Sequence, residues 1–239
     1  MIAMIISAVV AAVQGIGGPS EERTADIECV YEYRTSDDKG REDVYSTILQ
    51  VGKRSAKFVD YSTFQLDSAR TSGASEDQVE AFRLREEKKA QYFDYAIFQN
   101  EPAGNMTVYG TIITDRYSYT EDSKAMKWTL ADDEKTICGY QCHKAECEYG
   151  GRKWTAWYSQ DIPVSYGPWK LCGLPGLILA AEDSDGANKF EAIILRNGAS
   201  AITPVSDKNI TTTTREKFVK AKNMFESCLL YTSDAADEE

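Results

Sequence analysis

The stretch of this chain that decides its fold is Gly167-Pro168-Trp169-Lys170-Leu171-Cys172-Gly173-Leu174-Pro175-Gly176-Leu177-Ile178. Its three glycines and two prolines fit neither a helix nor a plain strand. Pro175 and Gly176 suit the second and third positions of a type II turn, in which Gly176 would take the positive φ. Residues 177–181 then run apolar, as a buried strand does. The stretch therefore predicts a buried turn that enters a strand beside Trp157 and Trp169; a tight connector without chemistry is the simplest interpretation.

Most of the remaining chain has the pattern of short strands. Residues 27–34 alternate, with Cys29, Tyr31 and Tyr33 on one face. Further strands are predicted over residues 44–51, 57–60, 105–111, 115–120, 124–130, 137–148, 153–159, 177–182 and 190–195, with a hairpin turn at Gly150-Gly151. Strands of this number and spacing predict a mainly β fold, a curved antiparallel sheet or open barrel similar to lipoprotein carriers of the periplasm.

One or two helices are predicted to cover the sheet. Ser75-Glu76-Asp77-Gln78 has the pattern of a capping box and opens a helix that runs to about Phe93. Its charged middle is expected to face solvent. Thr213 begins a second helix near the end of the chain. Neither repeats nor low-complexity linkers interrupt the pattern, so the sequence predicts a single domain.

Several motifs in one order resemble the GLPGLI family, which comprises secreted Bacteroidetes proteins of unknown activity and is named for the motif at residues 173–178. Residues 49–58, 137–145 and 151–164 are similar to other parts of that family. The resemblance covers residues 25–225 and implies a secreted, β-rich domain. It brings no catalytic residues. Cys138 and Cys172 stand where the family more usually has small residues or glycine, so it implies no cysteine pairing.

The two ends of the chain are set apart from this domain. Residues 1–13 form an apolar run too short to span a bilayer, and Gln14-Gly15 follows it. This pattern predicts a signal peptide over residues 1–20 that lacks its basic start, with export to the periplasm or cell envelope and no transmembrane span; a buried N-terminal strand is the alternative. Residues 228–239 resemble a translated sequencing adaptor rather than a natural acidic tail. The expected domain is therefore residues 25–227, truncated at its C-terminus.

The charge of the chain argues against nucleic acid as a partner. It has 27 basic and 38 acidic residues and a net charge of −11. Without residues 228–239 the chain has 27 basic and 34 acidic residues, so its net charge is −7. A moderately acidic surface does not favour phosphate backbones or anionic membranes, because these need clustered Lys and Arg.

Cysteine usage predicts disulfides if the protein is exported. Cys142 and Cys147 lie five residues apart on one predicted strand, so their side chains point to opposite faces. Cys138 and Cys142 share a face but lie roughly 13 Å apart in an extended strand, beyond the reach of a disulfide. A bridge is therefore predicted between Cys142 or Cys147 and either Cys29 or Cys172.

A metal site is the competing interpretation of the same cysteines. Cys138, Cys142, His143 and Cys147 have the spacing C-x3-C-H-x3-C, which offers thiolates and imidazole to zinc or cuprous copper. On a strand, however, Cys142 and His143 diverge to opposite faces. The sequence thus assigns no metal ligand and no cofactor. His143 is the only histidine of the chain, and it lies in the middle of a predicted strand. This position does not indicate a histidine-activated nucleophile, so no catalytic residue is assigned.

An aromatic cluster gives the candidate ligand or partner surface: Trp154, Trp157, Tyr158, Tyr166 and Trp169. Such a stripe is usually core packing, but Tyr and Trp also line carbohydrate, peptide and lipid sites.

The leading hypothesis is a non-enzymatic envelope protein that binds an apolar ligand, or a protein or glycan partner, on a curved sheet. A hydrolase that uses carboxylates and tyrosines on glycans or peptides is one alternative, and periplasmic copper or zinc handling is another. Asp132-Asp133-Glu134 is expected to be a solvated turn rather than an acid/base pair.

Overall fold

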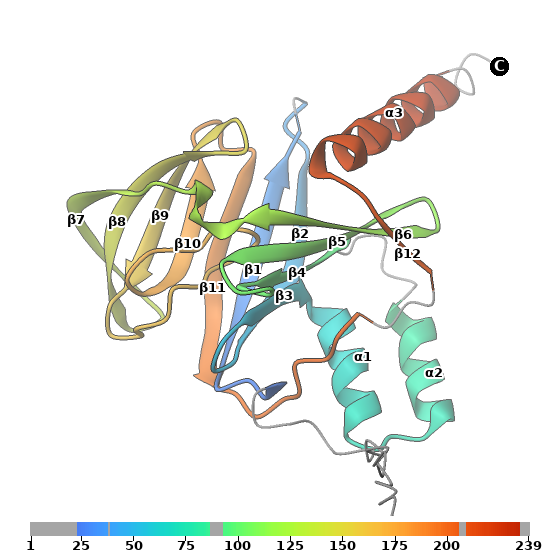
Figure 1. The fold of residues 1–239 in the computed structure, drawn as a ribbon, viewed down its shortest axis with the longest axis horizontal. Helices are drawn as coiled ribbons and strands as arrows, with labels where there is room; N and C mark the ends of the chain where they lie inside the picture. The colour runs from blue at the N-terminus through green and yellow to red at the C-terminus, as the bar shows by residue number, and fades with distance from the viewer. Residues whose placement is uncertain (1–22, 38, 87–92, 206–208, 235–239) are drawn as a thin grey trace, which may run out of the picture.

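The computed structural model describes residues 23–37, 39–86, 93–205 and 209–234 (Figure 1). The predicted signal peptide at residues 1–20 lies outside these ranges, as do residues 235–239 of the predicted adaptor segment. Among the described residues, no helix is both long enough and apolar enough to cross a bilayer.

Twelve strands in a single sheet dominate the described chain, which confirms the mainly β prediction. The strands are β1 (Ile27–Ser36), β2 (Glu42–Val51), β3 (Ala56–Asp60), β4 (Tyr95–Gln99), β5 (Asn105–Ile112), β6 (Asp115–Asp122), β7 (Thr129–Ile137), β8 (Tyr140–Tyr149), β9 (Arg152–Ser159), β10 (Leu177–Asp183), β11 (Asn188–Asn197) and β12 (Ile210–Thr212). The helices are α1 (Tyr61–Thr71), α2 (Glu76–Glu86), the short 3-10 helix η2 (Ser123–Ala125) and α3 (Arg215–Asp234).

The order of the strands forces the sheet to curl. They lie in the order β12-β6-β5-β4-β3-β2-β1-β11-β10-β9-β8-β7, and every pair is antiparallel except β12–β6. Consecutive strands β6 and β7 are therefore ten spacings apart, which is roughly 48 Å in a flat sheet at about 4.8 Å per strand. Residues 123–128 connect them and reach roughly 25 Å at most. Only a curved, open barrel brings the two ends of the sheet close enough.

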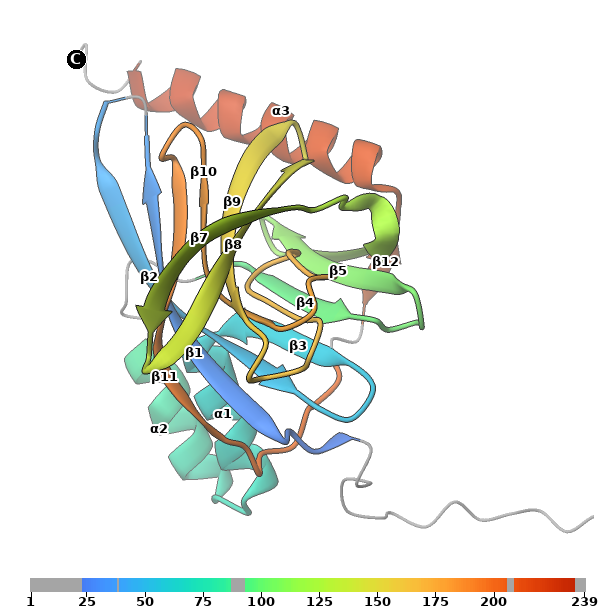
Figure 2. The same cartoon turned by 90° about the vertical axis from the view of Figure 1, so that its left-hand side faces the viewer.

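The inner face of this curved sheet holds the main hydrophobic core. Cys29, Tyr31 and Tyr33 of β1 point inward, as their alternation predicts, and Val30 points outward into a second, smaller cluster. In that outer cluster Phe64 of α1 packs on the sheet. Both views place α3 at one end of the barrel and α1 and α2 at the other (Figures 1 and 2).

Two local predictions are confirmed by hydrogen bonds or register. Ser75 N–H donates to Gln78 Oε1 at 3.0 Å while Gln78 N–H donates to Ser75 Oγ at 3.3 Å, which is the capping box that starts α2. Gly150 and Gly151 form the β8–β9 hairpin turn, with φ of +63° and +81°. Both glycines therefore occupy the left-handed region that this turn requires.

Three boundaries differ from the prediction. Residues 124–130 are not one strand, because η2 occupies residues 123–125 and β7 begins at Thr129. Cys138 lies in the β7–β8 turn with φ of +49°, not on a strand. The acidic run 132–134 is part of β7 rather than a turn. β7 ends the sheet, and charged side chains on an edge strand discourage pairing with another chain.

Candidate functional site

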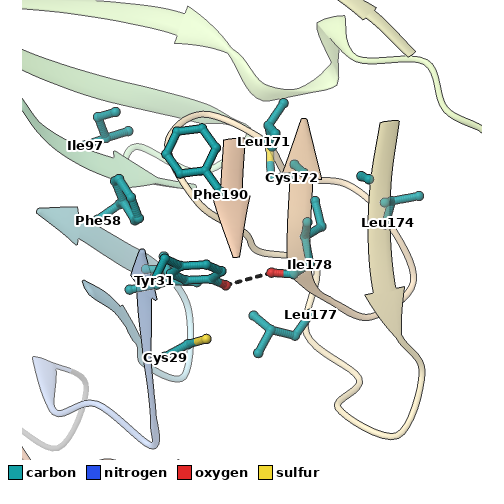
Figure 3. Close-up of a cluster of buried hydrophobic side chains, with 14 of the residues drawn as sticks. Cys29, Tyr31, Phe58, Ile97, Leu171, Cys172, Leu174, Leu177, Ile178 and Phe190 are labelled. Carbon is teal, nitrogen blue, oxygen red and sulfur yellow. Dashed lines mark hydrogen bonds between the residues drawn. The ribbon is translucent and has the colours of Figure 1, made fainter. Parts of the chain in front are cut away.

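The Gly-Leu-Pro-Gly-Leu-Ile segment lies inside the barrel. Leu174, Leu177 and Ile178 are buried, and they pack in the main core together with Tyr31 and Phe190 (Figure 3). The backbone of the segment is bound to the loop before it: Leu177 N–H donates to Ile162 O and Ile178 N–H to Tyr166 O, both at 3.0 Å. Tyr31 OH donates to Ile178 O at 2.6 Å. The segment is therefore fixed from two sides.

The predicted role of Gly176 is wrong. Its φ is not positive, so the type II turn does not form; Gly173 takes the positive φ instead, at +93°. Gly176 is required for a different reason. A Cβ at this position would collide with the carbonyl oxygen of Ser159 and lie 2.6 Å from its carbonyl carbon. The glycine permits the close approach of two backbone segments.

The five aromatic residues predicted as one surface lie in four places. Trp154 and Trp169 come together inside the barrel, with ring centroids 5.5 Å apart. Trp157 lies on the opposite face of β9, where Lys135 sits 4.5 Å from its ring. Tyr158 is buried in the core, and Tyr166 donates to Arg54 O at 2.8 Å near the outside. Only Trp154 and Trp169 therefore share a site.

That site is a cavity between the inner face of the sheet and α3, which we call the inner cavity. Its volume is about 540 Å³. It is lined by Tyr33, Phe93, Tyr95, Tyr119, Gly150, Arg152, Trp154, Trp169, Lys170, Asn188, Phe190, Arg215, Phe218, Val219, Lys222 and Asn223. These residues come from five strands, three connecting segments and α3, so the cavity forms only when the sheet is curled.

Aromatic rings form a continuous wall of the inner cavity. Tyr33 stacks on Phe190 with centroids 4.2 Å apart and an interplanar angle of 6°. Phe190 lies 6.3 Å from Trp154, which continues to Trp169. The ring centroid of Phe218 of α3 lies 5.3 Å from that of Tyr119, and both rings also line the cavity. Such a wall offers flat apolar area with polar groups at the ring edges.

A buried ionic network borders the cavity around Glu121. Lys170 Nζ lies 2.9 Å from Glu121 Oε2 and donates to Tyr119 OH at 3.1 Å. Arg215 Nε lies 2.9 Å from Glu121 Oε1, and Tyr149 OH donates to Glu121 Oε2 at 2.8 Å. Burial lowers the pKa of Lys170, and the Glu121 carboxylate opposes this shift. Burial, aided by Glu121, raises the pKa of Tyr149.

A second polar chain lies at the rim. Asp183, whose side chain is fully buried, accepts from Arg152 Nη1 and from Asn188 Nδ2, both at 2.7 Å. Asn188 Oδ1 in turn accepts from Tyr33 OH at 2.7 Å. Asp183 therefore orients three cavity-lining side chains without itself lining the cavity.

The loop that carries Trp169 and Lys170 is held in a strained conformation. Trp169 has φ of +53°, which is rare for a bulky side chain. Gln99, completely buried on β4, donates through Nε2 to Gly167 O and to Trp169 O, each at 2.8 Å. Gly167 N–H donates a hydrogen bond of 3.3 Å to Gln99 Oε1. One amide thus fixes the backbone that presents Trp169.

The five described cysteines are free thiols, so the predicted disulfide is not formed. Cys29, Cys142, Cys147 and Cys172 are each buried as small apolar side chains, which gives them a packing role without a bridge. Burial raises the pKa of Cys142 and Cys147 to about 11 and that of Cys172 to about 12, with a further contribution from nearby Cys147.

The candidate metal ligands do not converge. Cys142 Sγ lies 3.5 Å from Tyr140 O, while His143 Nδ1 lies 3.3 Å from Glu134 Oε1. In the described part of the chain, no group of three or more His, Cys, Asp or Glu side chains is placed to hold a metal ion.

Most lining residues of the inner cavity were not apparent from the sequence. Among the lining residues, Trp154 and Trp169 belong to the aromatic surface predicted from the sequence, and Tyr33 was predicted only to share one face of its strand with Cys29 and Tyr31. A further signal was the position of Trp169 in the 167–178 stretch, because a large ring among glycines and prolines marks a loop that presents it.

Comparison with known proteins supports the fold and leaves activity open. Residues 150–180 match the model of a family described as protein of unknown function (Porph_ging), a range that includes residues 173–178. No curated protein matches the chain. PNGF-II is similar in two crystal forms, P21 and C2, with TM-scores of 0.58 and 0.54. In both, identity is 15% and the match covers 83% of this chain but 33% of PNGF-II.

The PNGF-II likeness at this identity concerns the fold alone, and this chain spans about a third of that protein. A domain of an outer membrane lipoprotein-sorting protein from Vibrio parahaemolyticus shares 7% identity over 77% of this chain and 88% of its own length. Its TM-score is 0.24, so it carries no argument about the predicted likeness to lipoprotein carriers. The chain thus has a PNGF-II-like curved sheet and a segment typical of a family of unknown function.

Proposed function

We propose that this protein is an exported, non-enzymatic binding protein of the cell envelope that holds a ligand or partner in its inner cavity. Export follows from the apolar run at residues 1–13, and GLPGLI-family membership from the order of motifs between residues 25 and 225. The family match at residues 150–180 is consistent with that membership.

The observation that carries the binding proposal is the aromatic wall of the inner cavity. The aromatic side chains of Trp154, Trp169, Tyr33 and Phe190 line a space of about 540 Å³, within the size range of small-molecule sites. Trp169 is kept there against its backbone preference. A strained, buried loop that places a large ring in a cavity is typical of a binding site rather than of simple packing.

In the described parts of the chain, the contacts of the candidate residues favour neither alternative function. The hydrolase hypothesis needs a carboxylate available for chemistry, whereas Glu121 beside the cavity is engaged by Lys170, Arg215 and Tyr149. The copper or zinc hypothesis needs converging ligands, whereas Cys142 and His143 diverge. Binding without catalysis is therefore the function that we propose.

A ligand screen with a matched pair of tryptophan variants tests the proposal. Neutral saccharides, acidic saccharides, aromatic acids and fatty acids are added in turn while the melting temperature is followed, because a ligand of the folded state raises it. We expect at least one class to raise the melting temperature of the wild type. Trp169→Ala should abolish that rise, because its ring lines the cavity. Trp157→Ala, on the outer face, should preserve it.

Two outcomes would contradict the proposal. One is that no class raises the melting temperature at millimolar concentration. The other is that Trp157→Ala abolishes the rise while Trp169→Ala preserves it, which would move the binding surface to the outer face of β9.

A further inference from the structure

We infer that the ligand of the inner cavity carries a negative charge on a ring, an inference that rests on the proposed binding function. The shared chemistry is an acid group, such as a carboxylate, attached to a sugar or aromatic ring. Both the charges and the rings of the cavity lead to this conclusion.

The charges of the lining residues are all of one sign. Arg152, Lys170, Arg215 and Lys222 line the cavity, and none of its lining residues is Asp or Glu. The chain as a whole has more acidic than basic residues, 38 against 27. A cavity whose charged lining residues are all cations thus differs from the acidic chain as a whole, and it favours an anionic occupant.

The acidic partners of these cations lie behind them. Asp183 holds Arg152, Glu121 holds Lys170 and Arg215, and Asp94 lies 3.8 Å from Lys222. None of the three carboxylates lines the cavity. They fix the cations in position while the cations face the occupant, as in sites that are preorganised for an anion.

The depth of the charges argues for a ring rather than a fatty chain. Lys170 is deeply buried, whereas Arg152 and Arg215 are 41% and 45% exposed at the rim. A fatty-acid site needs an apolar bottom for the chain and polar groups at its mouth. Here cations occur at both levels, and the apolar lining between them consists mainly of aromatic side chains. That pattern suits a stacked ring with one or more acid groups.

Matched probes separate the charge from the ring. A galacturonate trimer is compared with a galactose trimer, and naphthalene-2-carboxylate with naphthalene-2-methanol, by calorimetric titration of the full chain. Each pair differs in the acid group. We expect one acid to bind about tenfold more tightly than its neutral partner at 50 mM NaCl. The advantage should shrink at 300 mM NaCl, because screening weakens charge interactions at a partly exposed site. The pair that binds identifies a sugar or an aromatic source.

Two variants on one helix provide the control. Lys222→Gln removes a cation of the cavity, and Lys220→Gln removes an exposed cation of α3 that does not line it. We expect Lys222→Gln to reduce the acid-to-neutral affinity ratio at least threefold, and Lys220→Gln to leave it unchanged. Equal effects of the two variants would show a general charge effect and overturn the inference.

The remaining outcomes distinguish the two levels of the proposal. If acid and neutral partners bind equally and Trp169→Ala abolishes both, the charge inference fails and the binding function stands. Palmitate is titrated as a fatty-acid control, and tighter binding of palmitate than of galacturonate trimer or naphthalene-2-carboxylate would also overturn the inference. If none of the probes binds at millimolar concentration, both the inference and the proposed function fail.

Discussion

The phenol of Tyr149 on β8 donates a 2.8 Å hydrogen bond to Glu121 Oε2 on β6, and so joins strands near opposite ends of the sheet. Nine strand spacings separate β6 from β8 along the sheet. The bond is therefore possible only because the sheet curls. Lys170 and Arg215 bind the same carboxylate. Glu121 therefore connects both ends of the sheet with the loop that carries Lys170 and with helix α3.

Tyr149→Phe should weaken this junction. The change removes one hydrogen bond to a buried carboxylate that keeps its two cations, and we expect it to lower the free energy of unfolding by about 1.5–3 kcal/mol. Tyr166→Phe is the control, because its hydroxyl bonds Arg54 O at a more exposed position and should cost less than about 1 kcal/mol. Urea unfolding of both variants measures the difference, and equal costs would show that Glu121 does not join the sheet ends.

Gly176→Ala should destabilise the whole domain through a clash between backbones. Its new Cβ would collide with the Ser159 carbonyl, so β9 and β10 must separate, and we expect a cost of about 3 kcal/mol or more. Gly186→Ala is the comparison, because Gly186 has φ of +68° but open space around it. It should cost only about 1–2 kcal/mol. If thermal melts show Gly186→Ala to be the more harmful, close approach is not the reason for Gly176.

The strands of the fold were predictable where their pattern was local. The inward-facing residues Cys29, Tyr31 and Tyr33 of β1 and the Gly150-Gly151 turn of the β8–β9 hairpin follow from neighbouring residues and were predicted. β4 was missed because its five residues alternate too briefly to be separated from the preceding helix. α1 was missed because its Ser and Thr residues favour a helix weakly, although Asp60 caps it by accepting from Ser62 N–H.

The candidate site was less predictable, because it depends on strand order. Trp154 and Trp157 are close in sequence but face opposite sides of β9. Trp154 and Phe190 are distant in sequence but lie on neighbouring parts of the inner wall. The Pro-Gly pattern also gave a wrong reason for Gly176. The pattern predicted a positive φ, whereas glycine is needed there because the backbone of Ser159 leaves no room for a Cβ. Neither distinction is contained in a local pattern.

Thiol labelling should separate the exposed cysteine from the buried ones. Cys138 is exposed in the β7–β8 turn, whereas Cys29, Cys142, Cys147 and Cys172 are buried. In native protein at pH 8 we expect maleimide to modify Cys138 first among these five, and the other four only after unfolding. Peptide mass mapping measures the order. A peptide pair joined by a Cys147–Cys172 disulfide would contradict the free thiols.

Alkaline pH should destabilise the protein through its buried thiols. An unfolded thiol ionises near pH 8.5, but burial raises the pKa of Cys29 and Cys172 to about 12 and that of Cys147 to about 11. The folded state then binds more protons, so stability is complete below pH 8.5 and is lost as pH rises towards 12.

Urea unfolding under reducing conditions measures this effect. Each buried thiol should cost roughly 2 kcal/mol at pH 10 relative to pH 7.5. Cys147→Ala is the matched variant, and its stability should fall less steeply over the same range. A free energy of unfolding that stays constant from pH 7.5 to pH 10 would exclude the proposed proton linkage.

Gln99 should control the inner cavity from a distance, because its amide holds the backbone of Gly167 and Trp169. Gln99→Leu keeps a similar volume but leaves two buried carbonyls without their donor, at a cost of about 2–4 kcal/mol. It should also release Trp169 from its strained conformation, which would weaken ligand binding. Gln50→Leu is the comparison, since Gln50 is equally buried but bonds Ser200 and Ala201 away from the cavity. Near-ultraviolet circular dichroism should change in the tryptophan region for Gln99→Leu and stay unchanged for Gln50→Leu. Loss of stability without any change in that spectrum would show that Gln99 supports the core but does not position Trp169.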